Sequence, residues 1–408
     1  MKKMMIAAMM LVSASTAFAQ DLVKQITKEK DYATASNLLQ ANLGSLTAEQ
    51  KAKCYNALVD LNASGFNKAY ESFVLNQQMG KNDKVEYVST LQGIKDALEC
   101  DIYDNQPNDK GKVAPKFTKK NAGRLASNRI LLILGGQEAQ EAGNNDQAYE
   151  YYKVYVESGV APMFAESVKD GKDTYLCEVA RVAANIAFQH KDFVAAEKYA
   201  DIALKDPKEA KSANNIKLAI LEDKLVSKED SLKYIETLEN VYSSDVTNDY
   251  VLTKLSMYYE SMGQKDKFIS FIDKKLASDP NNFTALALKG DAQMGSGKYD
   301  EAAETYIKAL NVCPEDVKVD VNAAIGDCYF IKAQERVNNY KGQLAPTTKQ
   351  VFADVYKKAI EYYEIARDLD VDRVKKSKYA YRLYGATDFV YGSDDAKTKE
   401  AAKLAGVE

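Results

Sequence analysis

This chain of 408 residues has few of the side chains from which catalytic and sugar-binding sites are built: no Trp, one His and seven Pro. A single His excludes every metal site that needs two imidazole ligands. The absence of Trp removes the strongest anchor of many sugar-binding platforms. Neither a GxSxG nor a GxxxxGK(S/T) motif occurs in the sequence, so nothing indicates a nucleophile elbow or a phosphate-binding loop. We expect no enzyme activity, no catalytic residues, no cofactor and no metal site.

Long apolar runs are also missing, apart from a short one near the N-terminus. Two lysines precede an apolar run over residues 4–12, and an Ala-Phe-Ala triplet ends at Ala19. This pattern predicts a signal peptide over residues 1–19 that is cleaved between Ala19 and Gln20. The run is too short to span a bilayer, and no run of about 18 apolar residues follows it. We therefore expect an exported chain without a membrane-spanning segment, placed in the periplasm, with the cell surface or secretion as alternatives.

The charge balance has no basic excess. Without residues 1–19, 53 Lys and Arg face 59 Asp and Glu, a net charge of −6. This mild acidity argues against nucleic acid and anionic lipid as partners. With 46% apolar and 28% charged residues, the composition is that of a folded globular chain.

Cysteine is sparse, odd in number and widely spaced. The five are Cys54, Cys100, Cys177, Cys313 and Cys328, and none forms a CxxC pair. Export permits disulfides, but a chain of this length does not need them. We interpret these residues as small buried side chains on helices. Cys313 and Cys328 are the pair to test for a bond, because they are close in sequence.

An internal repeat of 34 residues is the most informative pattern that is present. Between residues 255–282 and 288–316, a Gly, a Leu and a Pro each recur 34 positions later, as in Gly263 and Gly297. The residue pattern of each copy predicts a helix, a short turn with Gly and a second helix, followed by Pro. Small residues recur where two helices must cross closely, and tyrosines fill the larger gaps between them.

The segment GKYDEAAETYIKAL, followed by Pro314, resembles the tetratricopeptide repeat (TPR). One departure is Lys289, where a Leu usually precedes the Gly. Looser copies centre on Ala35, Ala69 and Ala196. The resemblance implies an all-α fold, a right-handed superhelical solenoid of antiparallel helix pairs with a concave face. Together with the leader, the chain resembles exported TPR proteins of the Bacteroidetes.

Breaks in the pattern divide the chain. We predict a signal peptide at 1–19, N-terminal helical repeats at 20–100, a loop insertion at 101–120, a main array at 121–390 with an insertion near 335–350, and a C-terminal capping helix at 391–408. The stretch after Asp101 has Pro and Gly but no apolar periodicity, which is typical of an ordered, functional loop. Its scattered oxygens lack the spacing of a calcium loop. We interpret His190 as a solvated turn residue, with a general base as the alternative.

In the resemblance, ligands contact an exposed stripe on the first helix of each pair, called helix A, at positions three or four residues apart. Mapped by register, the candidate groove residues are Arg181, Asn185, Tyr250, Thr253, Met257, Glu260, Asp291, Met294, Asp327 and Phe330. Such a mixture of aromatic, Met and charged side chains suits an extended peptide or a partner helix. For Phe330, and for Phe188 on the same stripe, packing between repeats is the alternative.

We therefore predict a non-enzymatic scaffold of the cell envelope that binds a protein or peptide in its concave groove. One alternative is a carbohydrate-binding helical protein associated with nutrient uptake, which the 27 tyrosines suggest. The other is an enzyme with an unrecognised site in the 101–117 loop.

Overall fold

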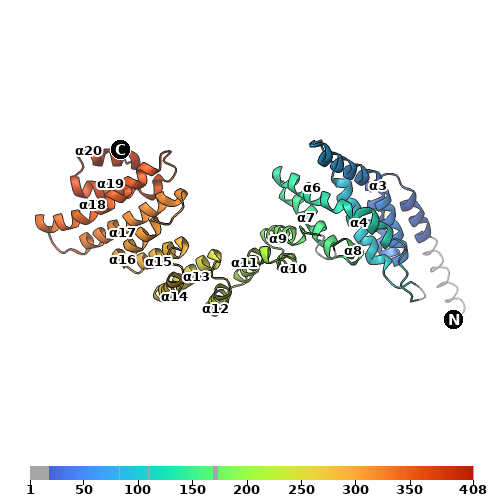
Figure 1. Cartoon of the computed structure of the whole chain (residues 1–408), viewed down its shortest axis with the longest axis horizontal. Helices are drawn as coiled ribbons and strands as arrows, with labels where there is room; N and C mark the ends of the chain where they lie inside the picture. Colours follow the sequence, from blue (N-terminus) through green and yellow to red (C-terminus); the bar gives the residue numbers. More distant parts are fainter. Residues whose placement is uncertain (1–17, 82, 109–110, 169–172, 408) are drawn as a thin grey trace, which may run out of the picture. The chain divides into compact units, whose positions relative to one another are not determined.

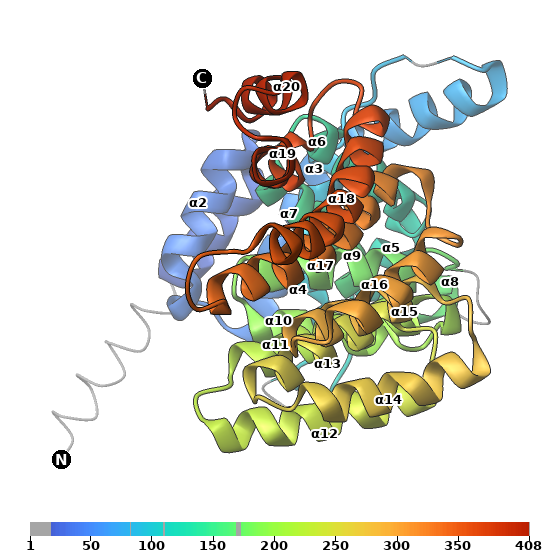
Figure 2. The ribbon, with the colours of Figure 1, turned by 90° about the vertical axis from the view of Figure 1, so that its left-hand side faces the viewer.

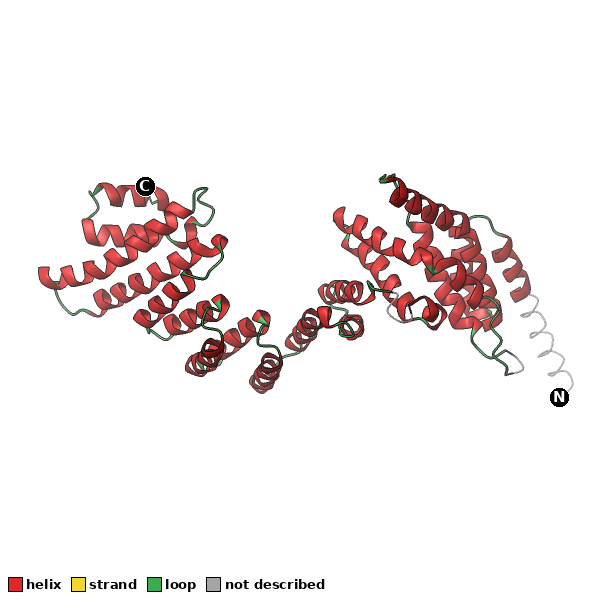
Figure 3. Ribbon diagram, in the orientation of Figure 1, coloured by secondary structure: helices red, strands yellow, loops and turns green. Residues whose placement is uncertain are grey.

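The computed structural model describes residues 18–81, 83–108, 111–168 and 173–407. Within these ranges the chain forms helices joined by turns, and it contains no strand (Figure 3). The predicted all-α class of antiparallel helix pairs is confirmed. The chain divides into two compact units, residues 1–223 and 224–408, here called unit 1 and unit 2.

Unit 1 contains a helical stretch at residues 18–28 followed by three well-packed helix pairs, α3 with α4, α6 with α7, and α9 with α10 (Figure 1). Its helices are α2 Tyr32–Asn42, α3 Ala48–Met79, α4 Val88–Asp104, α5 Thr118–Leu125, α6 Ile130–Glu141, α7 Asn145–Val160, α8 Ala165–Val168, α9 Leu176–Gln189, α10 Phe193–Ala203 and α11 Pro207–Asp223.

Unit 2 repeats the same helix pair along its length. Its helices are α12 Lys228–Ser244, α13 Asp249–Ser261, α14 Lys265–Ser278, α15 Phe283–Gly295, α16 Tyr299–Leu310, α17 Lys318–Asn339, α18 Pro346–Leu369, α19 Ala380–Tyr391 and α20 Ala396–Ala405. The long helices α17 and α18 lie side by side over most of their length (Figures 1 and 2).

The turn inside a pair explains why Gly recurs. Gly263 follows α13 with φ +67°, Gly297 follows α15 with φ +74°, and Gly143 follows α6 with φ +77°. A Cβ strains this left-handed backbone, so Gly is favoured where one helix stops and the next begins at once. The turn between α9 and α10 uses the same conformation without Gly, at Lys191 with φ +60°.

Alanine and tyrosine fill the helix crossings, as the repeat predicts. Ala302 and Ala309 on α16 are fully buried in one cluster with the ring of Tyr306, and the ring of Tyr363 on α18 is buried in a second cluster. A small side chain lets two helix backbones approach, and a tyrosine ring then closes the remaining gap. Much of the tyrosine excess is therefore core packing.

The predicted segment boundaries can now be placed on the helices. The loop predicted at 101–120 lies between α4 and α5, at residues 105–117. Near 335–350, the additional residues extend α17 and α18, which leaves only 340–345 as a connection. Helix α20 occupies the predicted C-terminal capping segment. The compact units meet at residues 223 and 224, so the predicted division at residue 121 stays a prediction.

The leader prediction falls mostly outside the described residues, which begin at 18. Ala19 is buried against Leu22 and Ile26, and Gln20 is exposed. None of the described helices is both long and apolar enough to cross a membrane.

All five cysteines are free. Cys54, Cys100 and Cys328 are buried, as the interpretation as small core residues requires, whereas Cys177 and Cys313 are half-buried. Cys313 and Cys328 are therefore not bonded to each other. Instead, the Cys313 thiol donates to the Leu310 carbonyl.

Candidate functional site

The first helices of successive pairs in unit 2 enclose an open cavity of about 540 Å³. Helices α15, α17 and α19 follow one another through this unit (Figure 1). The side chains that matter for its chemistry are Asp291 and Met294 from α15, Asp320 and Asp327 from α17, and Tyr381 and Arg382 from α19. The volume lies in the range of small-ligand and side-chain pockets.

A repeated arrangement of Gly, Asp and Tyr places two of these carboxylates. A Cβ on Gly290 would lie 2.6 Å from the ring of Tyr306, so only Gly lets this ring pack against α15. The Tyr306 hydroxyl then donates a hydrogen bond to Asp291. This arrangement fixes the Asp291 side chain at the edge of the cavity.

The next pair uses the same arrangement. A Cβ on Gly326 would lie 2.6 Å from the ring of Tyr363, and the Tyr363 hydroxyl donates to Asp327 at 2.6 Å. Equivalent residues in two consecutive repeats therefore present a carboxylate held by a buried tyrosine. The glycines were part of the repeat pattern, but the tyrosine-to-aspartate bond was not predicted.

The carboxylates differ in their cationic partners. Arg382 forms an ion pair with Asp327. Lys375 Nζ lies 2.5 Å and Lys378 Nζ 3.9 Å from the carboxylate of Asp320. Among the described residues, Asp291 has the Tyr306 hydroxyl as its partner and no cation.

The surroundings of the Asp291 carboxyl shift its pKa upward. Loss of solvation raises the pKa of Asp291, the nearby Glu260 carboxylate raises it further, and the Tyr306 hydrogen bond lowers it. Loss of solvation also raises the pKa of Asp327, against the lowering effects of Tyr363 and Arg382. A positive charge arriving at Asp291 would stabilise its ionised form.

Three predicted groove residues, Asp291, Met294 and Asp327, thus line one cavity. Phe330 is half-buried and does not line it: its ring centroid lies 5.4 Å from that of Tyr356, in edge contact, so it packs between helices.

The groove residues predicted on α13 lie in the same unit but outside this cavity. Met257 is exposed, and Tyr250 is half-buried with Lys254 Nζ 5.6 Å from its ring centroid. Thr253 is exposed and its hydroxyl donates to the Asp249 carbonyl. Glu260 pairs with Lys265 at 2.9 Å.

In unit 1 the predicted residues occupy the first helix of its last full pair, α9. Arg181 donates to Glu209 at 2.6 Å, and Asn185 is exposed. Phe188 is half-buried against Phe193, with ring centroids 5.8 Å apart. His190 ends α9 in an exposed turn, as expected, and its Nε2 lies 3.2 Å from Asp146.

Sequence reasoning missed Asp320, Tyr381 and Arg382. One signal was present: Gly385 and Phe389 on α19 have the same spacing as Gly326 and Phe330 on α17. Aligning them would have assigned α19 as a further first helix and placed Arg382 on its cavity-facing side.

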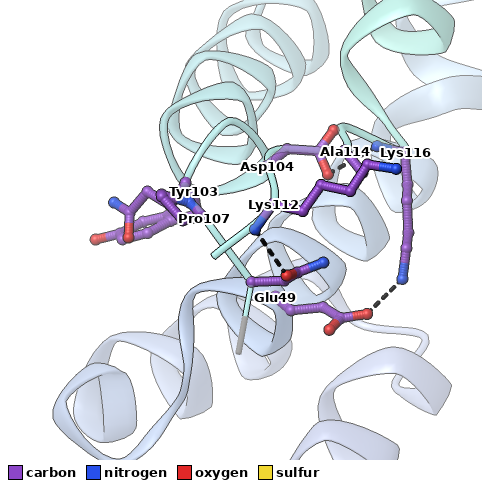
Figure 4. Close-up of a pocket in the computed structure, with 9 residues that line it drawn as sticks. Glu49, Tyr103, Asp104, Pro107, Lys112, Ala114 and Lys116 are labelled. Atoms are coloured by element: carbon purple, nitrogen blue, oxygen red, sulfur yellow. Dashed lines mark hydrogen bonds and ion pairs between the residues drawn. The ribbon is translucent and has the colours of Figure 1, made fainter. Parts of the chain in front are cut away.

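The 105–117 loop forms a second, much smaller pocket (Figure 4). Its volume is about 60 Å³, enough for a few waters and far below a substrate pocket. Asp104 accepts from the backbone N–H groups of Lys116 and Phe117 at 2.9 and 2.6 Å. Lys116 pairs with Glu49. The acids of this pocket are thus engaged in holding the loop, and no group of metal-binding side chains occurs in the described part of the chain.

These features define a TPR-like helical solenoid: antiparallel helix pairs, Gly at the turns and Tyr against Gly between the helices. No family model and no curated protein matches the chain.

Solved structures that match it carry the same type of repeat. One is a Signal Transduction ATPase with Numerous Domains (STAND) protein with a TPR sensor from Pyrococcus horikoshii, at 16% identity and TM-score 0.43. The match covers 88% of this chain and 52% of that one, so the chain spans about half the length of the archaeal protein. Another is a TPR repeats protein from Bacteroides fragilis, at 19% identity and TM-score 0.26, covering 62% of this chain and 97% of that one. At such scores the likeness carries no argument about function.

Proposed function

We propose that the chain is a non-enzymatic scaffold of the cell envelope that holds another protein or peptide against the first helices of its TPR-like repeats. The observation that carries this proposal is the cavity on α15, α17 and α19. It is open and combines charged, aromatic and thioether side chains, among them Asp291, Met294 and Tyr381. Such a mixture is typical of surfaces that bind peptides and helices.

The leader pattern that ends at Ala19 supports the envelope part of the proposal, and so does the chain's resemblance to exported TPR proteins of the Bacteroidetes. N-terminal sequencing of protein purified from its host tests it. We expect a mature chain that begins at Gln20. A chain that keeps its first residues, recovered from the cytoplasmic fraction, would refute export.

Site-specific photocrosslinking tests the binding surface. A benzophenone amino acid replaces Met294 in the cavity, and in a matched control it replaces Glu304, which is exposed on α16 and does not line the cavity. In host cells we expect a discrete crosslinked species from position 294 and none from position 304. Equal crosslinking at both positions, or none at either, contradicts binding at this cavity.

The two alternatives receive less support. Tyrosines such as Tyr306 and Tyr363 pack inside the helix pairs, so they are not available to stack on a sugar. The pocket at the 105–117 loop has a volume of about 60 Å³. The acids that line it, Glu49 on α3 and Asp104 on α4, are occupied by Lys116 and by backbone N–H groups. The loop therefore offers no pocket large enough for a substrate.

A further inference from the structure

We infer that the Asp291 carboxylate receives a lysine or arginine side chain from the bound partner segment. This inference rests on the proposed function and specifies the chemistry of the partner: a segment that carries a positive charge. The argument comes from comparing Asp291 with its equivalent in the next repeat, Asp327.

Asp327 shows what such a carboxylate binds. Its Oδ1 accepts from the Tyr363 hydroxyl at 2.6 Å, and its Oδ2 pairs with the Arg382 guanidinium. The position can therefore hold a tyrosine hydroxyl and a cation together, one on each oxygen. The cation comes from the next first helix along the unit, α19.

Asp291 has an equivalent tyrosine, Tyr306, but no described residue supplies it with a cation. Arg382 stands three residues before Gly385, and the equivalent residue of α17, three before Gly326, is Ala323. Ala323 lines the cavity but has no charge to offer. Asp291 thus has the tyrosine hydroxyl of the Asp327 arrangement but not the cation, and it lies on the wall of an open cavity.

The other charges of the cavity do not favour an anion. Arg382 is paired with Asp327, and Lys378 lies 3.9 Å from Asp320, which Lys375 approaches more closely at 2.5 Å. An incoming carboxylate or phosphate would have to displace Asp327 from Arg382, or share Lys378 with the Asp320 carboxylate. An incoming cation meets a carboxylate without displacing anything.

The rest of the lining suits a long cationic side chain. Tyr381 is 71% exposed and lines the same cavity, so its ring is available to a guanidinium or ammonium. Met294 supplies a flexible apolar surface for the methylene groups. One acid, one aromatic face and one thioether thus form a site for a Lys or Arg side chain.

The test uses the full chain and three short fluorescein-labelled peptides, with alternating Lys and Ala, Gln and Ala, or Glu and Ala. Binding is measured by fluorescence anisotropy at physiological ionic strength. We expect the lysine peptide to bind most tightly. Asp291→Asn keeps a hydrogen-bond acceptor for Tyr306 and should weaken its binding about five-fold. The matched control, Asp394→Asn, removes a fully exposed carboxylate outside the cavity and should leave binding unchanged.

A second pair of variants tests the aromatic wall. Tyr381→Ala should weaken the lysine peptide about three-fold. Tyr391→Ala, at the other end of α19, should have no effect. Circular dichroism verifies that each variant keeps the helical content of the parent chain.

Two results overturn the inference. If the lysine peptide binds the parent chain and the Asp291→Asn variant equally, the carboxylate does not receive the cation. If the glutamine or glutamate peptide binds more tightly than the lysine peptide, the partner is of another chemistry. In either case a crosslinked partner at position 294 would leave the proposed function standing, and failure of that crosslink would remove both.

Discussion

Both units contain an arginine, an aspartate and a tyrosine in contact. Unit 1 buries all three groups, whereas in unit 2 the arginine and the aspartate line a cavity and the tyrosine is buried behind them. In unit 1, Arg129 Nη1 lies 2.7 Å from Asp173, and both side chains are about one-twentieth exposed, at 6% and 5%. The Tyr155 hydroxyl also donates to Asp173. In unit 2, the Arg382 side chain is 42% exposed and that of Asp327 16%.

The comparison shows that burial separates a fully enclosed ion pair from one at an open cavity. Arg129 Nε also donates to Ser158 at 2.8 Å, and its guanidinium lies 4.6 Å from the Tyr155 ring centroid. The Arg129 guanidinium is therefore engaged on several sides inside unit 1, and it ties Asp173 to α7. The Arg382 group has an open side toward the cavity.

Removing the arginine should affect the two units very differently. Arg129→Ala leaves the Asp173 charge buried without a cation, so we expect the free energy of unfolding of unit 1 to fall by about 3–5 kcal/mol. Arg382→Ala should cost about 1 kcal/mol or less, because water can solvate Asp327. Urea unfolding followed by circular dichroism measures both. Equal losses would mean that burial does not distinguish the two pairs.

A second comparison concerns Asp96 in unit 1 and Asp291 in unit 2, two acids that each bond a tyrosine and have no ion-pair partner among the described residues. Asp96 is 7% exposed, and one of its oxygens is buried without a hydrogen-bond partner among the described residues. Burial raises the pKa of Asp96 to about 7, against the lowering effects of the Tyr32 hydrogen bond and Lys95, and Glu99 raises it slightly.

The raised pKa of Asp96 decides how the stability of unit 1 changes with pH. Since the folded pKa of Asp96 lies above its value in the unfolded chain, folding favours the protonated acid. Below the pKa of the unfolded chain, the protonated Asp96 carboxyl makes its full contribution to the stability of the fold. That contribution is lost as the pH rises toward the folded pKa of about 7. Asp96→Asn should therefore stabilise unit 1 by about 2 kcal/mol above neutral pH, and change little at pH near 4.

Urea unfolding at the two pH values measures this difference. Asp291→Asn is the matched variant. The Asp291 residue is exposed at the edge of an open cavity, although its carboxyl loses part of its solvation. We therefore expect a smaller pH-dependent gain in stability, and weaker lysine-peptide binding. A variant of Asp96 that is no more stable than the parent chain above neutral pH would contradict the prediction.

Replacing the glycines that contact tyrosine rings tests which of these tyrosines act only in packing. A Cβ would lie 2.3 Å from the Tyr152 ring at Gly136 in unit 1, and 2.6 Å from the Tyr306 ring at Gly290 in unit 2. We expect Gly136→Ala and Gly290→Ala each to destabilise by about 2 kcal/mol, because the ring must move. Only Gly290→Ala should also weaken lysine-peptide binding, since Tyr306 holds Asp291.

Thermal unfolding and fluorescence anisotropy measure these two effects. The control is Gly123→Ala on α5, where an added Cβ meets nothing within 4 Å. A stability gain of about 0.5–1 kcal/mol is expected there from helix propensity. If Gly290→Ala binds the lysine peptide as the parent chain does, the tyrosine does not position Asp291.

The fold was predictable from sequence because its requirements are local. A left-handed turn requires Gly at a fixed spacing, as at Gly263 and Gly297, and a close helix crossing requires Gly or Ala. Only some of the residues that line the cavity could be predicted from the sequence. Asp291 and Asp327 follow from the register of adjacent repeats, but Asp327 and Arg382 are 55 residues apart. Their contact depends on how the lengthened α17 and α18 stack, and the 34-residue spacing does not include that extension.

The smallest expected effect concerns the turn where the two units differ. Lys191 between α9 and α10 has φ +60°, whereas Gly263 between α13 and α14 has φ +67°. Left-handed backbone costs a residue with a Cβ about 1 kcal/mol, and Gly loses part of that advantage through its greater freedom in the unfolded chain. Lys191→Gly should therefore stabilise unit 1 by about 0.5 kcal/mol, and Gly263→Ala should destabilise unit 2 by about 1 kcal/mol. Changes of opposite sign in urea unfolding would confirm that one backbone rule governs both turns, and changes of the same sign would contradict it.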